Sequence, residues 1–301
     1  MPSLDPGLLD WAVGAAAPGA EVVEVRGLRD GGSPWLVRLG RGGGQRSVVL
    51  RVGHARDAAD LRTEVAALEL AAEHRLPAPR LLAAELDGEP PVVLVERLEG
   101  TSAIPTRRPP TRLRTLGHTA ARLHAVALAP GPALPRRDRP IAVEDFAALR
   151  RRQPPRPLLV EAEERVRRRP PGEDDVFVHG DLWQGNALWK GDTLTGLIDW
   201  DCAGAGPPGV DLGSLRCDAA VCFGLEAADD VLAGWEEEAG RPAAEVAHLD
   251  VVAALSTPPD MGWFAGAMAG QGRPDLDRDV LVRRRDAFLR SALDRLDAGT
   301  G

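Results

Sequence analysis

The stretch 176–211 constrains this fold more than any other part of the chain, because it places polar residues directly after short apolar runs. It reads VFVHGDLWQGNALWKGDTLTGLIDWDCAGAGPPGVD. Within it, the dipeptide Gly191-Asp192 separates the apolar runs 187–189 and 194–198. A turn dipeptide between two short apolar runs predicts a β-hairpin. We therefore expect the residues before the first run and after the second to meet at one end of this hairpin.

Two carboxylates and one amide flank the predicted hairpin. Asp181 and Asn186 precede its first strand, and Asp199 follows its second. Their oxygen atoms are hard ligands, and Mg²⁺ usually takes one or two carboxylates together with water and substrate phosphate. A polar loop that only satisfies its own backbone is the alternative, but acids gathered at strand ends are costly without a cation. The pattern therefore predicts a Mg²⁺ site.

The order and spacing of these residues resemble a known family. Protein kinases carry a loop H-R-D-x-x-x-x-N, followed by a metal-binding Asp on the next hairpin strand. The segments HGDLWQGN, IDWD and PPGVDLG closely resemble the hallmark motifs of the aminoglycoside phosphotransferase family, which are kinase-like small-molecule phosphotransferases. The resemblance implies an α+β, protein-kinase-like fold of two lobes. A small five-stranded antiparallel N-terminal lobe would span residues 1–100, and a larger, mainly helical C-terminal lobe residues 101–301.

The resemblance also implies roles within this stretch. Asp181 would orient the acceptor hydroxyl as the catalytic residue and take its proton late, while His179 would support the loop. Asn186 and Asp199 would hold Mg²⁺ against the phosphates of ATP or GTP. Asp211 would bond the backbone of the catalytic loop.

The first hundred residues carry the expected nucleotide site. Three strands are predicted there, over 21–26, 35–39 and 47–52, joined by two glycine-rich loops. The run Gly42–Gly44 suits a hairpin turn, since glycine tolerates positive φ. The resemblance implies that the other loop covers the nucleotide phosphates, and its candidates are Gly31, Gly32 and Ser33.

Arg51 ends the third predicted strand, where kinase-like folds usually place a lysine against the phosphates. Arginine offers phosphate a bidentate fork in place of a point charge, so the role survives with a different geometry. The helix expected over 57–75 carries Glu64 at the edge of its apolar stripe, within reach of Arg51. Glu69, on the other flank of that stripe, is the competing partner.

Two further strands, over 80–86 and 91–98, complete the expected sheet. The second, in VVLVERLEG, resembles the hinge strand of kinase-like folds. The resemblance implies that backbone groups near Glu96 and Leu98 bind the adenine edge. Val49 and Leu94 would line the adenine ring.

The C-terminal part of the chain reads as a series of helices, with an exposed loop expected at 131–140. His124 is interpreted as a packing residue. The segment 204–209 fits G-x-G-x-x-G, but two of its residues are prolines without N–H groups, so a dinucleotide site is rejected. Candidates for contact with the acceptor are Asp201, Asp218, Glu236, Asp260 and Trp263.

Composition narrows the class of protein. The net charge of −8 over 301 residues argues against a nucleic-acid partner, which normally faces a basic surface. No apolar run reaches membrane-spanning length and no signal peptide is recognised, so a cytoplasmic protein without a membrane partner is expected. The three cysteines lack zinc-site spacing and are expected to be reduced. Monomer and homodimer both remain open.

The sequence thus predicts an ATP-dependent O-phosphotransferase whose partner is a small-molecule hydroxyl acceptor. The acceptor would be an aminoglycoside or other antibiotic, a sugar or an amino alcohol, and GTP is an alternative donor. Arg51 in the lysine position motivates a second hypothesis, a nucleotide-binding pseudokinase with a regulatory role. A metal-dependent phosphohydrolase is the third hypothesis, disfavoured by the hinge-like strand and the Arg51 and Glu64 pair.

Overall fold

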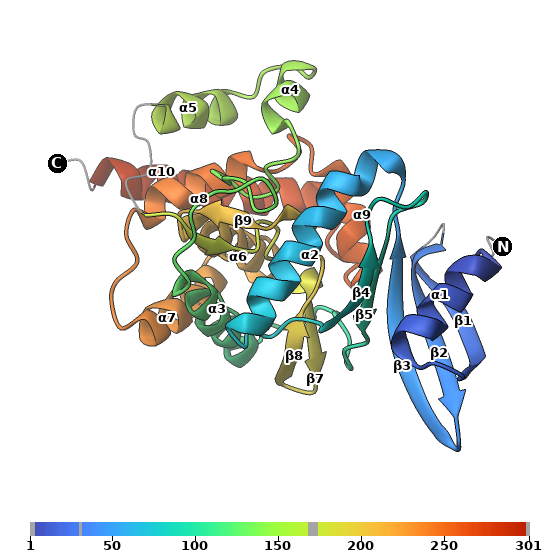
Figure 1. Cartoon of the computed structure of the whole chain (residues 1–301). Coiled ribbons are helices and arrows are strands. Elements are labelled where there is room, and N and C mark those ends of the chain that lie inside the picture. Colours follow the sequence, from blue (N-terminus) through green and yellow to red (C-terminus); the bar gives the residue numbers. More distant parts are fainter. Residues whose placement is uncertain (1–3, 30–31, 168–173, 299–301) are drawn as a thin grey trace. The chain divides into compact units, whose positions relative to one another are not determined.

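The computed structural model describes residues 4–29, 32–167 and 174–298 of the chain. It divides into two compact units (Figure 1). The first comprises Met1–Glu99 with Gly196–Asp201, and the second Gly100–Thr195 with Cys202–Gly301. The sequence places 196–201 in the C-terminal lobe, whereas here this segment groups with the first unit. Among the helices of the described residues, none has the length and apolar character needed to cross a membrane.

The first unit is built on a five-stranded antiparallel sheet, which confirms the predicted N-terminal lobe. Its strand order is β1-β2-β3-β5-β4. The elements are α1 (Pro6–Ala16), β1 (Glu21–Arg29), β2 (Gly32–Arg41), β3 (Gly44–Val52), η1 (Ala55–Asp57), α2 (Ala58–Glu73), β4 (Leu81–Glu85) and β5 (Val92–Glu96).

The two faces of this sheet have different partners, because side chains alternate between faces along each strand. One face packs against α1, where Leu50 and Leu94 join Ala12 in an apolar cluster. The opposite face of β3 carries Arg51, which pairs with Glu64 of α2. The second face thus combines this ion pair with apolar side chains such as Val93, the cross-strand partner of Arg51.

The segment 196–201 is fixed to the first unit by its backbone. Leu197 N donates a hydrogen bond of 2.7 Å to Pro77 O. A Cβ on Gly196 would lie 2.6 Å from Leu98 Cδ1 and 3.2 Å from Pro77 O, so a larger residue there would displace the Leu98 side chain.

Leu197 ends β8 (Thr193–Leu197), which pairs with β7 (Ala187–Lys190). The predicted hairpin is thus confirmed.

The second unit is mainly helical, as predicted. It contains α3 (Pro110–His124), α4 (Phe146–Arg151), α5 (Pro157–Val166), α6 (Gly209–Phe223), α7 (Glu226–Ala239), α8 (Val246–Leu255), α9 (Gly262–Gly270) and α10 (Arg278–Ala298). Its short elements are β6 (Val176–Val178), η2 (Gln184–Asn186) and β9 (Gly204–Gly206), while η3 (Trp200–Cys202) begins in the first unit.

The loop 131–140 differs from the sequence expectation of an exposed loop. Arg137 is buried, and its backbone N–H donates to Ala205 O at 2.7 Å. A Cβ on Gly204 or Gly206 would lie 2.2 Å from Pro135 O or 2.1 Å from Arg137 O, respectively. The glycines of the G-x-G-x-x-G segment therefore admit this loop, which the local sequence does not reveal.

Helices α3 and α7 lie side by side in the second unit (Figure 1). Each contributes a glycine to the contact. A Cβ on Gly117 of α3 would lie 2.1 Å from Val231 O, and one on Gly234 of α7 would lie 2.2 Å from Arg114 O. The two backbones can approach this closely only because both side chains are absent.

We predict that Gly117→Ala lowers the free energy of unfolding by about 1–3 kcal/mol, the usual cost of overpacking. Gly266→Ala in α9 is the matched control, since nothing lies within 4 Å of its Cβ position. That change should raise the free energy of unfolding by up to about 1 kcal/mol through helix propensity. Urea unfolding of both variants measures the difference, and equal stabilities would contradict the close approach of α3 and α7.

Candidate active site

The predicted catalytic loop begins after β6 and is held by one buried carboxylate. Asp211, in the first turn of α6, is fully buried. Its Oδ2 accepts a hydrogen bond from His179 N at 2.8 Å, and its Oδ1 accepts one from Gly180 N at 2.9 Å. Gly180 has φ of 81°, and a Cβ there would lie 2.0 Å from Cys202 O. The carboxylate and the glycine together fix the path of the loop.

A buried histidine completes the surroundings of Asp211. Trp235 Nε1 donates to His124 Nδ1 at 2.9 Å, so the histidine proton is assigned to Nε2. That nitrogen lies 3.2 Å from Asp211 Oδ2 and donates to it. The sequence predicts only a packing role for His124. A buried Asp211 requires hydrogen-bond donors, and this requirement could have indicated His124 on a neighbouring helix as one of them.

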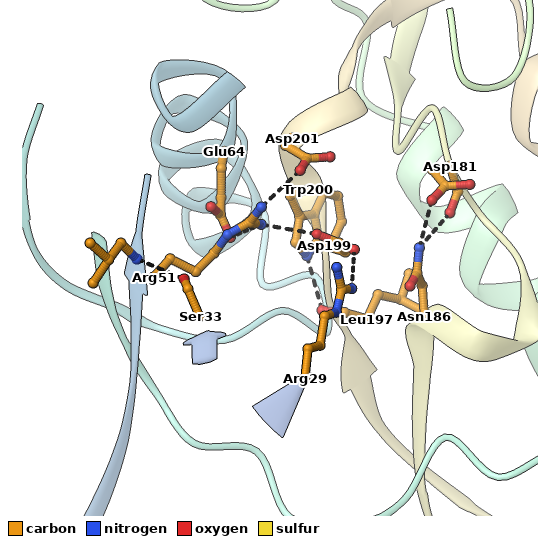
Figure 2. A network of polar contacts seen from close by, with 11 residues as sticks. Arg29, Ser33, Arg51, Glu64, Asp181, Asn186, Leu197, Asp199, Trp200 and Asp201 are labelled. Atoms are coloured by element: carbon orange, nitrogen blue, oxygen red, sulfur yellow. Dashed lines mark hydrogen bonds and ion pairs between the residues drawn. The ribbon is translucent and has the colours of Figure 1, made fainter. Parts of the chain in front are cut away.

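Asp181 and Asn186 lie in direct contact within this loop (Figure 2). Asn186 Nδ2 donates to Asp181 Oδ2 at 3.0 Å and to Asp181 O at 2.9 Å. The short turn η2 brings the two residues together. Because the amide nitrogen of Asn186 is used by Asp181, the amide oxygen is the atom that a cation would bind. His179, the first residue of the loop, is fully buried.

Asp218 supports the catalytic loop, which revises its assignment as an acceptor contact. Its buried carboxylate Oδ2 accepts hydrogen bonds from Gln184 N at 3.2 Å and Gln184 Nε2 at 2.7 Å. Burial raises the pKa of Asp218 to about 6, although the bonds from Gln184 act to lower it. The helix α6 is buried on nearly every side, so periodicity gave no indication of which way this residue faces.

In the first unit, one guanidinium binds three carboxylates (Figure 2). Arg51 Nη1 lies 3.1 Å from Glu64 Oε1 and 2.9 Å from Asp199 Oδ1. Arg51 Nη2 lies 2.9 Å from Asp201 Oδ2. The pairing predicted with Glu64 is therefore present. Asp201, a predicted acceptor contact, is also a partner of Arg51.

The charges in this cluster perturb one another. Burial raises the pKa of Glu64 to about 7, and Arg51 opposes that rise. For Arg51 itself, burial acts to lower the pKa, but the carboxylates of Glu64, Asp199 and Asp201 outweigh it and raise the pKa. Within the described residues, Glu64 Oε2 is buried without a hydrogen-bond partner. A strongly perturbed cluster of this kind is typical of functional sites.

Asp199 is held by two arginines and has an uncommon backbone. Its Oδ2 lies 2.9 Å from Arg29 Nη2, while its Oδ1 binds Arg51. Its φ of 69° is left-handed, a conformation that costs energy for residues with a side chain. Arg29 was missed by the sequence reasoning because 170 residues separate it from Asp199.

The predicted phosphate loop is described only in part. Gly31 lies outside the described residues, and Gly32 begins β2. Ser33 Oγ accepts a hydrogen bond of 3.0 Å from Val52 N, which ties the start of β2 to the end of β3. The serine therefore fixes the base of the loop.

Strand register corrects the assignment of Leu94 to the adenine site. Leu94 pairs with Leu50, so both side chains face α1. Val49 lies on the other face, where its cross-strand partner is Val95. Because neighbouring residues of a strand face opposite sides of the sheet, Val95 and not Leu94 lies beside Val49 on this face.

The predicted hinge residues are tied to the first unit. Glu96 N donates to Arg80 O at 2.9 Å, and its side chain pairs with Arg80 Nε at 3.2 Å. Leu98 packs against the backbone at Gly196. The amide of Glu96 is thus already used, and its carbonyl is the group to consider for an adenine contact.

One family model matches most of the chain. It is described as the phosphotransferase enzyme family, and the match covers residues 24–247. The chain therefore belongs to the phosphotransferase enzyme family. The predicted kinship and enzyme class are confirmed: the protein is a small-molecule phosphotransferase. No curated protein sequence matched it.

The fold of this phosphotransferase is shared with solved antibiotic phosphotransferases. Macrolide 2'-phosphotransferase MphH from Brachybacterium faecium is 20% identical, with a TM-score of 0.64, covering 92% of this chain and 96% of that one. An aminoglycoside-3'-phosphotransferase of type VIII is 25% identical, with a TM-score of 0.55 and coverages of 79% and 93%. A thermostable mutant of aminoglycoside phosphotransferase APH(4)-Ia, in ternary complex with AMP-PNP and hygromycin B, is 17% identical, with a TM-score of 0.58 and coverages of 90% and 95%.

Of the remaining acceptor candidates in the phosphotransferase, Trp263 presents the largest exposed apolar surface. Its side chain is 50% exposed, and its ring stacks parallel to Phe146 with centroids 6.3 Å apart. By contrast, Asp260 Oδ1 accepts from Gly262 N at 3.1 Å, and Glu236 Oε1 accepts from Ala243 N at 3.0 Å. Both carboxylates therefore have local structural partners.

We predict a pH-dependent difference in stability between the wild type and Asp218→Asn. The folded-state pKa of about 6 exceeds the ordinary value of 3.8 for an aspartate side chain. The folded protein therefore holds this proton more tightly, and the resulting stabilisation is present below pH 3.8 and lost as pH rises through 6. The free energy of unfolding of the wild type should fall by roughly 2–3 kcal/mol relative to the variant over that range.

Urea unfolding of both proteins at several pH values measures this difference. The asparagine variant serves as the reference, because its amide does not titrate and its other carboxylates are those of the wild type. A difference in stability that stays constant with pH would show that Asp218 has the same pKa in the folded and unfolded protein, and would contradict this prediction.

Proposed function

We propose that this phosphotransferase moves the γ-phosphoryl group of Mg-ATP or Mg-GTP to a hydroxyl of a small molecule. The observation that carries the proposal is the contact between Asp181 and Asn186, on a loop whose backbone is bonded to the buried Asp211. The family match supports the reaction class. The nucleotide, the metal and the acceptor are the proposed parts.

Asp181 is the proposed catalytic residue. Phosphoryl transfer has a loose transition state, so the protein mainly positions groups and neutralises charge. The carboxylate of Asp181 would accept a hydrogen bond from the acceptor hydroxyl and take its proton late in the reaction. The hydrogen bond from Asn186 Nδ2 to Oδ2 orients that carboxylate. His179, whose backbone N–H is bonded to Asp211, is the proposed support of the loop.

Asn186 and Asp199 are the proposed ligands of Mg²⁺. Their amide and carboxylate oxygens suit this ion, which would neutralise developing charge on the phosphates. Both oxygens of Asp199 bind guanidinium groups at 2.9 Å, so the carboxylate lies where it attracts cations.

Arg51 is the proposed partner of the nucleotide phosphates, with Glu64 holding it in place. Val49 and Val95 offer an apolar surface to the adenine ring, and the backbone at Glu96 and Leu98 offers hydrogen bonds. Gly31, Gly32 and Ser33 remain the proposed phosphate loop. These roles rest on the arrangement around Arg51 within the first unit.

The proposed acceptor is an aminoglycoside or other antibiotic, a sugar or an amino alcohol. Similar structures include a macrolide 2'-phosphotransferase and an aminoglycoside phosphotransferase in ternary complex with AMP-PNP and hygromycin B. Trp263, with its exposed ring stacked on Phe146, is the proposed acceptor contact. The segment before Phe146 touches the catalytic loop, since Ile141 N donates to Gly180 O at 2.7 Å.

An ADP-release screen tests the proposal. Mg-ATP or Mg-GTP is incubated with aminoglycosides, macrolides, sugars and amino alcohols, and wild type is compared with Asp181→Asn. We expect one acceptor class to stimulate ADP release, with a loss of about a hundredfold or more in the variant because the catalytic carboxylate is absent. With that acceptor, Trp263→Ala should raise the KM of the acceptor and leave the KM of the nucleotide unchanged.

The controls separate the competing functions. Phosphate release that needs no acceptor, and whose rate does not change when nucleotide binding is lost, would indicate a metal-dependent phosphohydrolase. Nucleotide binding without stimulation by any compound would favour the pseudokinase. Stimulation that persists unchanged in Asp181→Asn would contradict the role of that residue.

A further inference from the structure

Arg29 is the last residue of β1 and lies immediately before the undescribed residues 30–31. Its Nη2 is 2.9 Å from Asp199 Oδ2 (Figure 2). The other oxygen of Asp199, Oδ1, is 2.9 Å from Arg51 Nη1. Each oxygen of the proposed metal ligand therefore has a guanidinium partner.

The two arginines differ in how firmly they are held. The side chain of Arg51 is 23% exposed and binds three carboxylates. The side chain of Arg29 is 64% exposed, and in the ranges that the structure describes Asp199 is its only carboxylate partner. An exposed ion pair contributes little free energy. Arg29 is therefore the partner that Asp199 can release.

A cation at Asp199 and a guanidinium on the same carboxylate repel each other. A nucleotide that arrives with Mg²⁺ also brings phosphate oxygens, which bind a guanidinium fork with charge-assisted hydrogen bonds. Arg29 stands at the end of β1, at the entrance to the proposed phosphate loop. It can thus exchange a carboxylate for phosphate without losing an anionic partner.

We propose that Arg29 is a phosphate-binding residue that neutralises Asp199 until the metal nucleotide arrives. On arrival, the metal takes the place of the guanidinium at Asp199, and Arg29 turns to the phosphates. The proposal rests on the proposed function for the identity of the ligand. It adds a phosphate-binding residue outside the kinase-like motifs.

Opposite effects on two ligands distinguish this role from a structural one. Removing the guanidinium frees Asp199 for a metal ion alone, so metal binding should strengthen. The same change removes a phosphate contact, so binding of the metal nucleotide should weaken. A change that merely disturbed the fold would weaken both.

The test compares Arg29→Gln and Arg29→Lys with the wild type. Arg26→Gln is the matched control, because Arg26 lies on the same strand, has a side chain 60% exposed and pairs with Glu24 at 3.7 Å. Mn²⁺ alone is titrated by the loss of its free paramagnetic signal. Mn-AMP-PNP and adenosine are titrated by calorimetry, which requires no acceptor.

For Arg29→Gln we expect several-fold tighter binding of Mn²⁺ alone and about tenfold or more weaker binding of Mn-AMP-PNP, with adenosine unchanged. For both Mn²⁺ and Mn-AMP-PNP, the affinity of Arg29→Lys should lie between those of the wild type and Arg29→Gln. The affinities of Arg26→Gln should match those of the wild type. Unchanged or weaker Mn²⁺ binding in Arg29→Gln would overturn the proposal, as would unchanged binding of Mn-AMP-PNP. Failure of every acceptor in the screen would defeat the proposed reaction and leave these binding results standing.

Discussion

The arrangement of the first unit depends on a single guanidinium that satisfies three carboxylates. Ionised carboxylates taken out of water destabilise a fold unless each has a partner. Arg51 provides those partners to Glu64 from α2 and to Asp199 and Asp201 from the segment after β8. This also explains why arginine suits the position where kinase-like folds carry lysine. The planar fork directs its N–H groups to separate oxygens, whereas an ammonium acts as a point charge.

In the second unit, buried carboxylates, and not a guanidinium, hold the neighbouring segments in place. There a buried carboxylate, Asp211, accepts the backbone N–H groups of His179 and Gly180 and the ring N–H of His124. Asp218 similarly receives the backbone and side-chain N–H groups of Gln184. Each end of the loop that carries Asp181 and Asn186 is thereby tied to α6. Positioning by buried charge suits phosphoryl transfer, in which orientation of groups matters more than covalent chemistry.

The parts of this account that sequence could predict are those set by local spacing. The hairpin follows from its turn dipeptide. For the partner of Arg51, the helix stripe left Glu64 and Glu69 open, and the family resemblance favoured Glu64, which the structure places beside Arg51. The wrong predictions have a common physical cause: the surroundings of these residues are set by segments distant in the sequence. Leu94 was assigned to the wrong face because register depends on the partner strand, and Asp218 because α6 is buried nearly all round. The link between Arg29 and Asp199 has no local signal at all.

The most direct test of the central claim, that the Arg51 cluster binds nucleotide phosphate, is calorimetric titration of Mg-ADP into wild type, Arg51→Lys and Arg51→Gln. Thermal unfolding of each protein shows first that the fold is kept. The account predicts that Arg51→Gln binds Mg-ADP about tenfold or more weakly, since charged hydrogen bonds to the phosphates are lost, while Arg51→Lys keeps most of the affinity. Equal affinity of the folded Arg51→Gln variant and the wild type would contradict it.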